Sequence, residues 1–425
     1  MIQHHIKRAK NLVFSGTAKD TYTLFTGNVL SAFLGFLFVF FTARFINKTD
    51  AGVFFAVTNL AVMVSSVADV GIASGIVNFI SEALASGDRV LAEKYMKAAF
   101  MIRLGVVLLL SFVSIAATSF ISPRLLASND PMSGIWVGLI ILSLFLWMFL
   151  PYILQARKNF LGSVSTDLTF MTTRLCFLFI LTILGGASLY KVFGSYLLAG
   201  LSAGVLGFIL VGTDFFKAKP EIEIYKKLFN FSGWLGINRI TSAISGNLDV
   251  QMMAAMLGAL STAVYSIPSK LASFIVVLGG SFSAVLATRL AGFGDREKEK
   301  SYILKALLVT FPIIAGIIFW VIIAKPFMFI LFPKYMDSVP AFRMLAIANI
   351  PFILTVPAVS AIIYSIKKPK FIGIVSVVQL ASMFLLDLYL IPRYGVLGPG
   401  ITLAVTNTLL AIYMWVITIK TYWFS

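Results

Sequence analysis

Eight ionisable side chains interrupt the long apolar segments of this 425-residue sequence, and they are its first candidates for chemistry. They are Asp69, Arg103, Asp167, Arg174, Arg239, Asp249, Lys270 and Asp387. A charge at the centre of a bilayer costs between about 2.5 and more than 10 kcal/mol, so charged residues are rare there and are usually functional. These side chains are therefore candidates for binding a substrate or a coupling ion.

These eight residues differ in how far they lie from the ends of their apolar segments. Arg103 lies close to one end of its segment and Asp387 close to the end of another, so we expect both to contact interfacial water. Asp167 and Arg174 are seven residues apart on one helix face, about 10 Å from each other, which is too far for a direct ion pair. Structural and functional roles are both open for this second pair. The three deepest charges are basic.

Polar or small residues also recur at helical spacing in three segments. The stripes are Asn238, Ser242, Ser245 and Asp249; Ser266, Lys270, Ser273 and Gly280; and Asn28, Ser31, Gly35 and Thr42. Such a stripe can simply allow tight helix packing, which is the favoured interpretation of the third. The charges in the first two favour a water-lined cavity.

The elements that position these side chains must be membrane helices. Hydrophobic residues make up 59% of the chain and charged residues 12%, and the mean hydropathy is +0.96, whereas soluble domains have about 25% charged residues. The apolar runs approach the roughly 20 residues that a helix needs to cross a bilayer. Alternating segments of about 10 residues, the signature of a membrane barrel, do not occur.

Twelve spans are predicted, and the first is too long for a signal-peptide core, so we expect it to be an uncleaved helix. The predicted spans are Thr21–Thr42, Gly52–Ile80, Ala98–Ile121, Gly134–Leu154, Leu161–Leu184, Val192–Val211, Phe229–Leu257, Ser261–Thr288, Ser301–Ala324, Val339–Ser365, Phe371–Ile391 and Leu397–Ile419.

The basic residues predict the orientation. Of the 34 Lys and Arg residues, 22 fall on the side of the N-terminus, 8 on the opposite side and 4 inside spans. Because basic residues in short loops stay in the cytoplasm, both termini are expected there, in a multi-pass protein of the cytoplasmic membrane. The net charge of +17 is then mainly a topology signal, and nucleic acid is not an expected partner.

An internal repeat predicts two lobes. Gly87-Asp88-Arg89 with Tyr95 recurs 207 residues later as Gly294-Asp295-Arg296 with Tyr302. An even number of helices per half gives both halves the same orientation, which indicates parallel repeats. We predict an N-terminal six-helix lobe at 1–213, a basic cytoplasmic linker at 214–228 and a C-terminal six-helix lobe at 229–425.

Several ordered motifs resemble one family. Ala43-Arg44-Phe45-Ile46, Gly52-Val53-Phe54 and Asp69-Val70-Gly71 are similar to the first hairpin of the polysaccharide transporters, or oligosaccharide flippases, of the multidrug/oligosaccharidyl-lipid/polysaccharide (MOP) exporter superfamily. The other motifs that resemble this family are Gln155 to Phe160, Asn247-Leu248-Asp249, Ala263 to Ser266, Leu331 to Tyr335 and Ile391 to Gly400. Pro333 and the pair Ile46-Asn47 depart from the family pattern.

The resemblance implies two six-helix lobes that form a V around a central cavity, and alternating access as the mechanism. The implied substrate is a polyprenyl-pyrophosphate-linked oligosaccharide. We therefore expect Arg239 and Lys270, with Arg174 as a third cation, to hold the pyrophosphate. Asn238, Ser242, Ser266 and Asn28 are expected to line the path of the glycan.

The expected partners beyond this substrate are membrane lipid, a coupling H⁺ or Na⁺, and glycan polymerases or glycosyltransferases. Asp69 or Asp249 is the expected residue for ion coupling. No enzyme activity, cofactor or metal site is predicted, because no nucleophile motif, phosphate-binding glycine loop or metal-ligand spacing occurs.

Alternatives remain within the same superfamily. A multidrug and toxin exporter would have the same number of helices, but it would bind organic cations and favour buried acids over buried bases. A flippase for peptidoglycan precursors would be expected to have two more helices.

Overall fold

Helices are the only regular elements in the part of the chain that the computed structural model describes, which is residues 16–69, 71–290, 295–366 and 369–424. Ten of its segments are long and apolar enough to cross a membrane, so this is a multi-pass membrane protein. The prediction of an all-helical membrane architecture is confirmed.

Two of these ten segments can each cross a membrane twice. Arg239–Ala287 has 49 residues and Phe371–Trp423 has 53, more than twice the roughly 20 that one crossing needs. The first segment is broken inside α11 (Leu248–Leu290), where Gly258 has a φ of 81° and a ψ of −179°. The second is broken between α14 (Pro369–Tyr394) and α15 (Gly398–Trp423) by a short 3-10 turn, η4 (Gly395–Leu397). Counting these breaks gives the twelve crossings that the sequence predicts.

Contacts divide the chain into two compact units. Unit 1 holds the described residues of Met1–Ile46 together with Leu60–Ser119 and Pro131–Ile240, and unit 2 holds Asn47–Asn59, Phe120–Asp130 and the described residues of Thr241–Ser425. The boundary falls inside α10 (Ile222–Ser245), and unit 2 includes two segments from the first half of the chain. The lobes at 1–213 and 229–425, with a linker at 214–228, stay a prediction.

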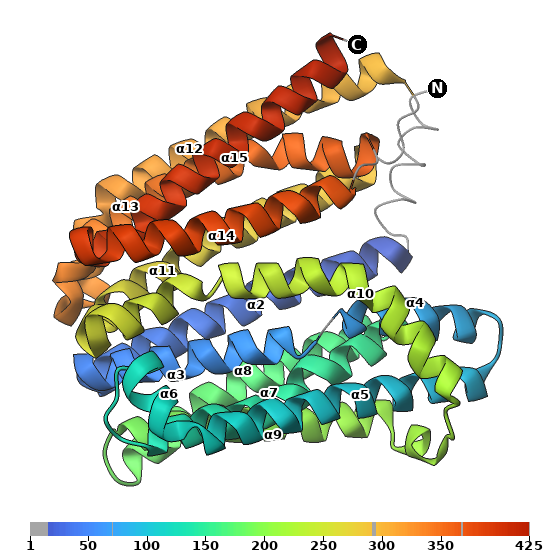
Figure 1. Cartoon of the computed structure of the whole chain (residues 1–425), viewed down its shortest axis with the longest axis horizontal. Coiled ribbons are helices and arrows are strands. Elements are labelled where there is room, and N and C mark those ends of the chain that lie inside the picture. Colours follow the sequence, from blue (N-terminus) through green and yellow to red (C-terminus); the bar gives the residue numbers. More distant parts are fainter. Residues whose placement is uncertain (1–15, 70, 291–294, 367–368, 425) are drawn as a thin grey trace. The chain divides into compact units, whose positions relative to one another are not determined.

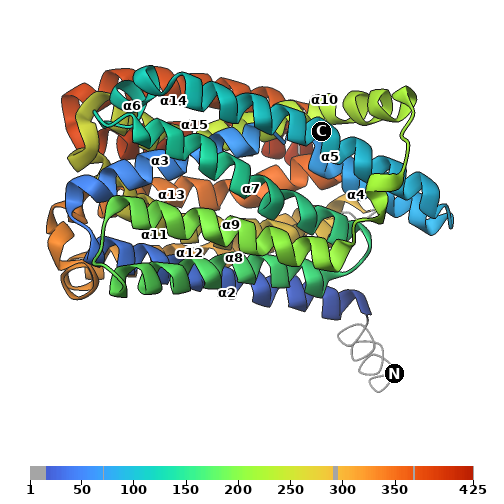
Figure 2. The same cartoon turned by 90° about the horizontal axis from the view of Figure 1, so that it is seen from below.

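Unit 1 is a bundle whose long helices run alongside one another (Figure 2). Its helices are α2 (Gly16–Phe45), α4 (Ile72–Ala85), α5 (Arg89–Ala116), α7 (Met132–Ala156), α8 (Phe160–Ile183) and α9 (Leu189–Val211), with the 3-10 turn η1 (Asp214–Lys217) and most of α10. α7 packs against α4, α5, α8 and α9, and α8 packs against α2, α7 and α9. The helices α3 (Lys48–Val67) and α6 (Thr118–Leu125) are each shared between the two units.

The predicted single span Gly52–Ile80 is wrong in one respect, because it is two helices. α3 ends at Val67 and α4 begins at Ile72. Gly71 has a φ of 76°, a backbone conformation that glycine adopts without the steric cost that a Cβ brings. The largely apolar sequence hides this break, which places Asp69 in the turn between α3 and α4.

Side-chain caps explain several helix starts. The Asp88 carboxylate accepts a hydrogen bond from the Leu91 N–H at 2.8 Å at the start of α5. Asp295 accepts one from the Glu297 N–H at 3.0 Å at the start of α12 (Arg296–Leu331). The repeated Asp-Arg pair of the sequence therefore marks two helix starts with the same capping chemistry.

The departure from the family pattern at Asn47 has a similar explanation. The Asn47 side-chain oxygen accepts a hydrogen bond from the Asp50 N–H at 2.8 Å, and its amide donates to the Asp50 carboxylate at 2.9 Å. This arrangement satisfies a free N–H of the first turn of α3. Pro333, the other departure, opens the 3-10 turn η2 (Pro333–Ser338), where its missing N–H costs nothing.

Unit 2 is centred on α13 (Val339–Ser360), which packs against α11, α12 and α15. In Figure 1 these helices and α14 run alongside one another. A π-helical turn, η3 (Ala361–Ser365), follows α13. One buried cluster joins α11 to α13 and α14 through Met253, Tyr265, Leu345 and Ile391.

A glycine allows the early segment of unit 2 to approach α11 closely. A Cβ on Gly52 would lie 1.8 Å from the carbonyl oxygen of Ala259, directly after the break at Gly258. Backbone cannot yield as the end of a flexible side chain can, so only glycine fits at position 52. Asn59 supports the same packing, because its side-chain amide donates to the Asn247 carbonyl at 2.7 Å.

We predict that Gly52→Ala destabilises the purified protein by about 1–3 kcal/mol and that Gly52→Val destabilises it more, because the added methyl groups must displace backbone. Thermal unfolding in detergent measures this. Gly316→Ala is the matched control, since a Cβ there meets nothing within 4 Å. A Gly52→Val protein as stable as the wild type would contradict the close approach.

Candidate functional site

The first candidate site is a buried ion cluster in unit 1. Asp69 is 4% exposed and Arg103 is 1% exposed. One Arg103 guanidinium nitrogen lies 3.1 Å from the Asp69 carboxylate and also donates to the Met148 carbonyl at 3.2 Å. The expectation that Arg103 reaches interfacial water is therefore wrong, because the acid in the helix break provides the partner that water would have provided.

Arg239 is the second cation on the same carboxylate. Its Nη1 lies 3.4 Å from the other Asp69 oxygen and 3.3 Å from the Tyr152 hydroxyl, and its guanidinium carbon is 5.7 Å from the centre of the Tyr152 ring. The Arg239 side chain is 41% exposed, whereas that of Asp69 is 6% exposed. One carboxylate thus serves two guanidinium groups, and the cluster keeps a net positive charge whose accessible part is Arg239.

Arg174 has a different environment. It is 6% exposed, and its guanidinium carbon lies 4.2 Å from the ring centre of Phe38, 4.9 Å from that of Tyr196 and 5.2 Å from that of Phe170. These cation–π contacts compensate the charge inside the helix bundle. A role of Arg174 in substrate binding stays a prediction, and it requires this enclosure to open.

The spacing of Asp167 and Arg174 predicts that they form no direct ion pair, and none is found between them. Its carboxylate accepts hydrogen bonds from the buried Ser31 hydroxyl and from the Trp147 ring nitrogen, the latter at 3.1 Å. The stripe of Asn28, Ser31, Gly35 and Thr42 on α2 thus contributes Ser31 to an internal hydrogen bond. Asn28, the stripe residue expected on the glycan path, is exposed on α2.

The second candidate site is a pair of acids in unit 2. The Asp249 carboxylate accepts a hydrogen bond from the Tyr265 hydroxyl and one from the Val250 N–H at 2.8 Å. Asp387 on α14 is 0% exposed and lies close enough to Asp249 to interact with it electrostatically. The expectation that Asp387 contacts interfacial water is therefore wrong.

The polar atoms around Asp387 are poorly paired. Within the described residues, both of its carboxylate oxygens and the nearby Thr402 hydroxyl lack a well-formed hydrogen bond. Burying a bare carboxylate costs several kcal/mol, so such a group normally holds a proton or a cation. Two acids and a hydroxyl with unused lone pairs provide oxygen donors for a small cation, although no group of three His, Cys, Asp or Glu residues that could hold a metal occurs in the described part of the chain.

The remaining predicted residues lie on α10 and α11. Lys270 is exposed on α11 and lies within electrostatic range of Asp249. Ser242 is exposed near the end of α10, whereas Ser266 is fully buried. Asn238 falls in α10, but its side chain is outside the described part of the structure.

Two tyrosines of these sites were not predicted from the sequence. Tyr152 and Tyr265 each place a hydroxyl on a charged group, one on Arg239 and the other on Asp249. Tyrosines are common near membrane interfaces, so neither has a distinctive local pattern. Asp387 is visible in the sequence as an acid in an apolar segment. Because it lies near the end of that segment, the sequence favoured an interfacial position.

Comparison with known proteins places the chain in a family. A sequence model described as "Polysaccharide biosynthesis protein" matches residues 17–291. The chain belongs to this polysaccharide biosynthesis protein family. A putative O-antigen transporter of Shigella flexneri is 22% identical over 237 residues, which cover 52% of this chain and 57% of the relative, a little over half of its length.

Solved structures show that this member of the polysaccharide biosynthesis protein family has the fold of the MOP superfamily. An inward-facing multidrug resistance transporter of the MATE family is similar with a TM-score of 0.77, at 15% identity over 92% of this chain and 94% of the other. The lipid II flippase MurJ in an inward closed conformation is similar with a TM-score of 0.75, at 15% identity over 93% and 87% of the two chains. The predicted resemblance is confirmed at the level of family and fold.

The two arginines on Asp69 are expected to differ in their contribution to stability. Arg103→Gln removes one partner of a fully buried pair and should cost about 3–5 kcal/mol. Arg239→Gln should cost about 1 kcal/mol or less, because water reaches that side chain. Equilibrium unfolding in detergent distinguishes the two, and equal losses would show that Arg239 is as structural as Arg103.

Proposed function

We propose that this protein is a flippase that moves a polyprenyl-pyrophosphate-linked oligosaccharide from the cytoplasmic to the outer leaflet of the cytoplasmic membrane by alternating access. Membership in the polysaccharide biosynthesis protein family supports the class of substrate. The likeness to the Shigella flexneri relative, a putative O-antigen transporter, supports transport rather than synthesis. The charge asymmetry of the loops supports an orientation with both termini in the cytoplasm.

The observation that carries the proposal is the half-exposed guanidinium of Arg239. Its ion pair with Asp69 is long, at 3.4 Å, and Asp69 already has a second cation at 3.1 Å. A phosphate oxygen can therefore take one position on Arg239 without leaving Asp69 unpaired. Guanidinium groups bind phosphate in a bidentate, charge-assisted geometry that suits a pyrophosphate.

Lys270 is the second proposed phosphate ligand. It is exposed on unit 2 and lies within electrostatic range of Asp249. The proposed substrate path also includes hydrogen-bonding groups for sugar hydroxyls, which are Ser242, Ser266, Asn238 and Asn28. Arg174, within its aromatic enclosure, is the third proposed cation.

Flipping against a gradient requires an energy source, and we propose coupling to an inward flow of H⁺ or Na⁺ through Asp249 and Asp387. The unpaired oxygens of Asp387 beside Asp249 and Thr402 support this assignment. Asp69 is the other acid that the sequence suggests for coupling. Its carboxylate is occupied by two guanidinium groups, so the pair in unit 2 has more capacity for a cation.

The alternative is a cation-coupled multidrug exporter, since a transporter of that kind has the same fold. The bare acid Asp387 is the observation that favours it, because an organic cation could bind there. Two cations argue against an exporter of organic cations. Arg239 is half-exposed and Lys270 is exposed, and both would repel a positively charged substrate.

We predict that Arg239→Gln and Lys270→Gln each slow the flipping of a polyprenyl-pyrophosphate oligosaccharide by about tenfold or more, since each change removes a charge-assisted bond to phosphate. The measurement is the appearance of substrate in the outer leaflet of proteoliposomes. Lys227→Gln is the charge-matched control, because Lys227 pairs with Glu223 on an exposed helix face.

Wild-type flipping rates in both variants would exclude the proposed phosphate site. Arg239→Lys keeps the charge but loses the bidentate geometry, and it should retain part of the rate. Efflux of an organic cation such as ethidium that Asp387→Asn abolishes, with no glycan flipping, would favour the exporter.

Ion coupling gives a separate prediction. Asp387→Asn and Asp249→Asn should remove the acceleration of flipping by an imposed Na⁺ or pH gradient, because the amide neither binds the cation nor carries the proton. Flipping without a gradient should remain measurable. Acceleration that survives in both variants would move the coupling site elsewhere, with Asp69→Asn as the next variant to measure.

A further inference from the structure

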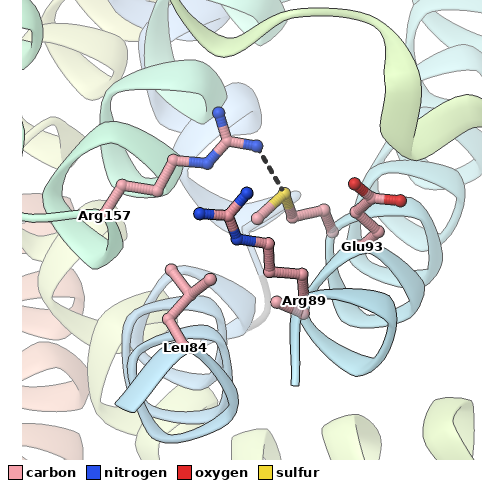
Figure 3. A pocket seen from close by; sticks show the side chains of 6 residues that line it. Leu84, Arg89, Glu93 and Arg157 are labelled. Atoms are coloured by element: carbon pink, nitrogen blue, oxygen red, sulfur yellow. Dashed lines mark hydrogen bonds between the residues drawn. The ribbon is translucent and has the colours of Figure 1, made fainter. Parts of the chain in front are cut away.

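A basic pocket lies in unit 1, at the ends of its helices and away from the Asp69 cluster. It has a volume of about 330 Å³ and is lined by Leu84, Arg89, Ala92, Glu93, Met96 and Arg157. This is within the range of small-molecule sites, about 300–1,000 Å³. Figure 3 shows both guanidinium groups in the pocket, with the Glu93 carboxylate on the other side.

The walls of the pocket are held by contacts at one end of the bundle. Arg157 follows the last residue of α7 and donates to the Val211 carbonyl, at the end of α9, at 2.6 Å. Its second terminal nitrogen contacts the Met96 sulfur at 3.3 Å. The Ser81 hydroxyl donates to the Ala156 carbonyl at 3.0 Å and fixes α4 against α7. The half-buried guanidinium of Arg157 therefore has a fixed position.

Arg89 is the less constrained cation of the pocket. It is the first residue of α5, and no hydrogen bond or ion pair of its side chain is found within the described residues. The equivalent arginine of the repeat, Arg296, donates to the Thr421 carbonyl and lies against the Tyr422 ring. Two equivalent arginines thus differ, and the one in unit 1 points into a cavity.

Nearby lysines are already engaged. Lys94 pairs with Glu221 at 2.6 Å, and this hydrogen bond lowers the pKa of the exposed Glu221 carboxyl. Lys97 donates to the carbonyls of Phe216 and Ala218. Among the residues that line the pocket, the charged ones are Arg89, Arg157 and Glu93, so the lining has two cations and one acid. Burial lowers the pKa of Arg157, and the Glu93 carboxylate raises it in part.

We infer that this pocket binds a phosphate group, and that its ligand is the head group of an acidic phospholipid. Two guanidinium groups that share a cavity repel each other unless an anion lies between them. The pocket lies at the ends of two helices of membrane-crossing length, Met132–Ala156 and Arg89–Ala116, and lipid head groups lie beside such helix ends. Basic pockets between helices at this depth are suited to anionic lipids, and a phosphodiester fits two guanidinium groups.

The test is titration of the purified full chain in detergent with dihexanoyl-phosphatidylglycerol, read by the midpoint of thermal unfolding. Dihexanoyl-phosphatidylcholine is the neutral-head-group control, and inorganic phosphate tests a soluble source of the same group. We expect phosphatidylglycerol to raise the midpoint at concentrations where phosphatidylcholine does not.

Four variants make the test specific. Arg89→Gln should require about ten times more phosphatidylglycerol, because one charge-assisted bond is lost while no internal contact is broken. Glu93→Gln should require less lipid, since it removes the acidic side chain from the pocket lining. Lys158→Gln removes a charge next to Arg157 without changing the pocket lining and should behave as the wild type. Arg157→Gln should also weaken binding, with a lower starting midpoint because the bond to Val211 is lost.

Each outcome decides between alternatives. An Arg89-dependent shift with inorganic phosphate as large as that with lipid would retain the phosphate pocket but assign it to a soluble anion, which overturns the lipid assignment. Equal titration of the wild type, Arg89→Gln and Glu93→Gln, or no response to either anion, would overturn the site itself.

Discussion

A charge inside a bilayer must be compensated within the protein, and the carboxylate of Asp69 meets this requirement for two arginines. Arg103 is buried completely and its charge would be uncompensated without it, whereas Arg239 shares the same carboxylate from a half-exposed position. Removing water strengthens both attractions. The packing of α5 and α7 around the helix break depends on this acid, because the alternative is an isolated guanidinium in an apolar bundle.

The two units compensate their charges in opposite ways. Unit 1 has more buried or half-buried cations than it has acids to pair with them, and part of the compensation comes from the rings around Arg174. Unit 2 has two neighbouring acids, of which Asp387 has no cation within hydrogen-bonding distance among the described residues. The same repeat therefore starts α5 and α12 with equivalent caps, but the two units have different chemistry. The proposed phosphate ligand Arg239 thus lies in unit 1, and the acids proposed for ion coupling, Asp249 and Asp387, lie in unit 2.

Much of the architecture could be predicted from the sequence because the bilayer restricts the choices. Length and hydropathy gave the spans, since the backbone in hydrocarbon must form helices, and the repeat at Asp88 and Asp295 corresponds to two real N-caps. The helix break before Gly71 and the one at Gly258 could not be predicted, because a glycine in an apolar run does not reveal its φ. The ion pairs between side chains of different helices could not be predicted from the sequence either. Arg103 and Asp387 lie near segment ends in sequence, but neighbouring helices cover those ends and exclude water.

Helix breaks and charges coincide in this protein, and the coincidence has a mechanical consequence. Asp69 accepts a hydrogen bond from the Ala73 N–H at 3.2 Å in the first turns of α4, so the acid that neutralises the arginines also helps to fix the start of a helix. Asp249 stands near the start of α11 and accepts the Tyr265 hydroxyl from the other side of the break at Gly258. A change in the partners of either acid therefore alters a backbone hinge as well as a charge. In both places the charged group and the break in the helix are linked directly, because Asp69 lies two residues before Gly71 and the bond from Tyr265 to Asp249 spans Gly258.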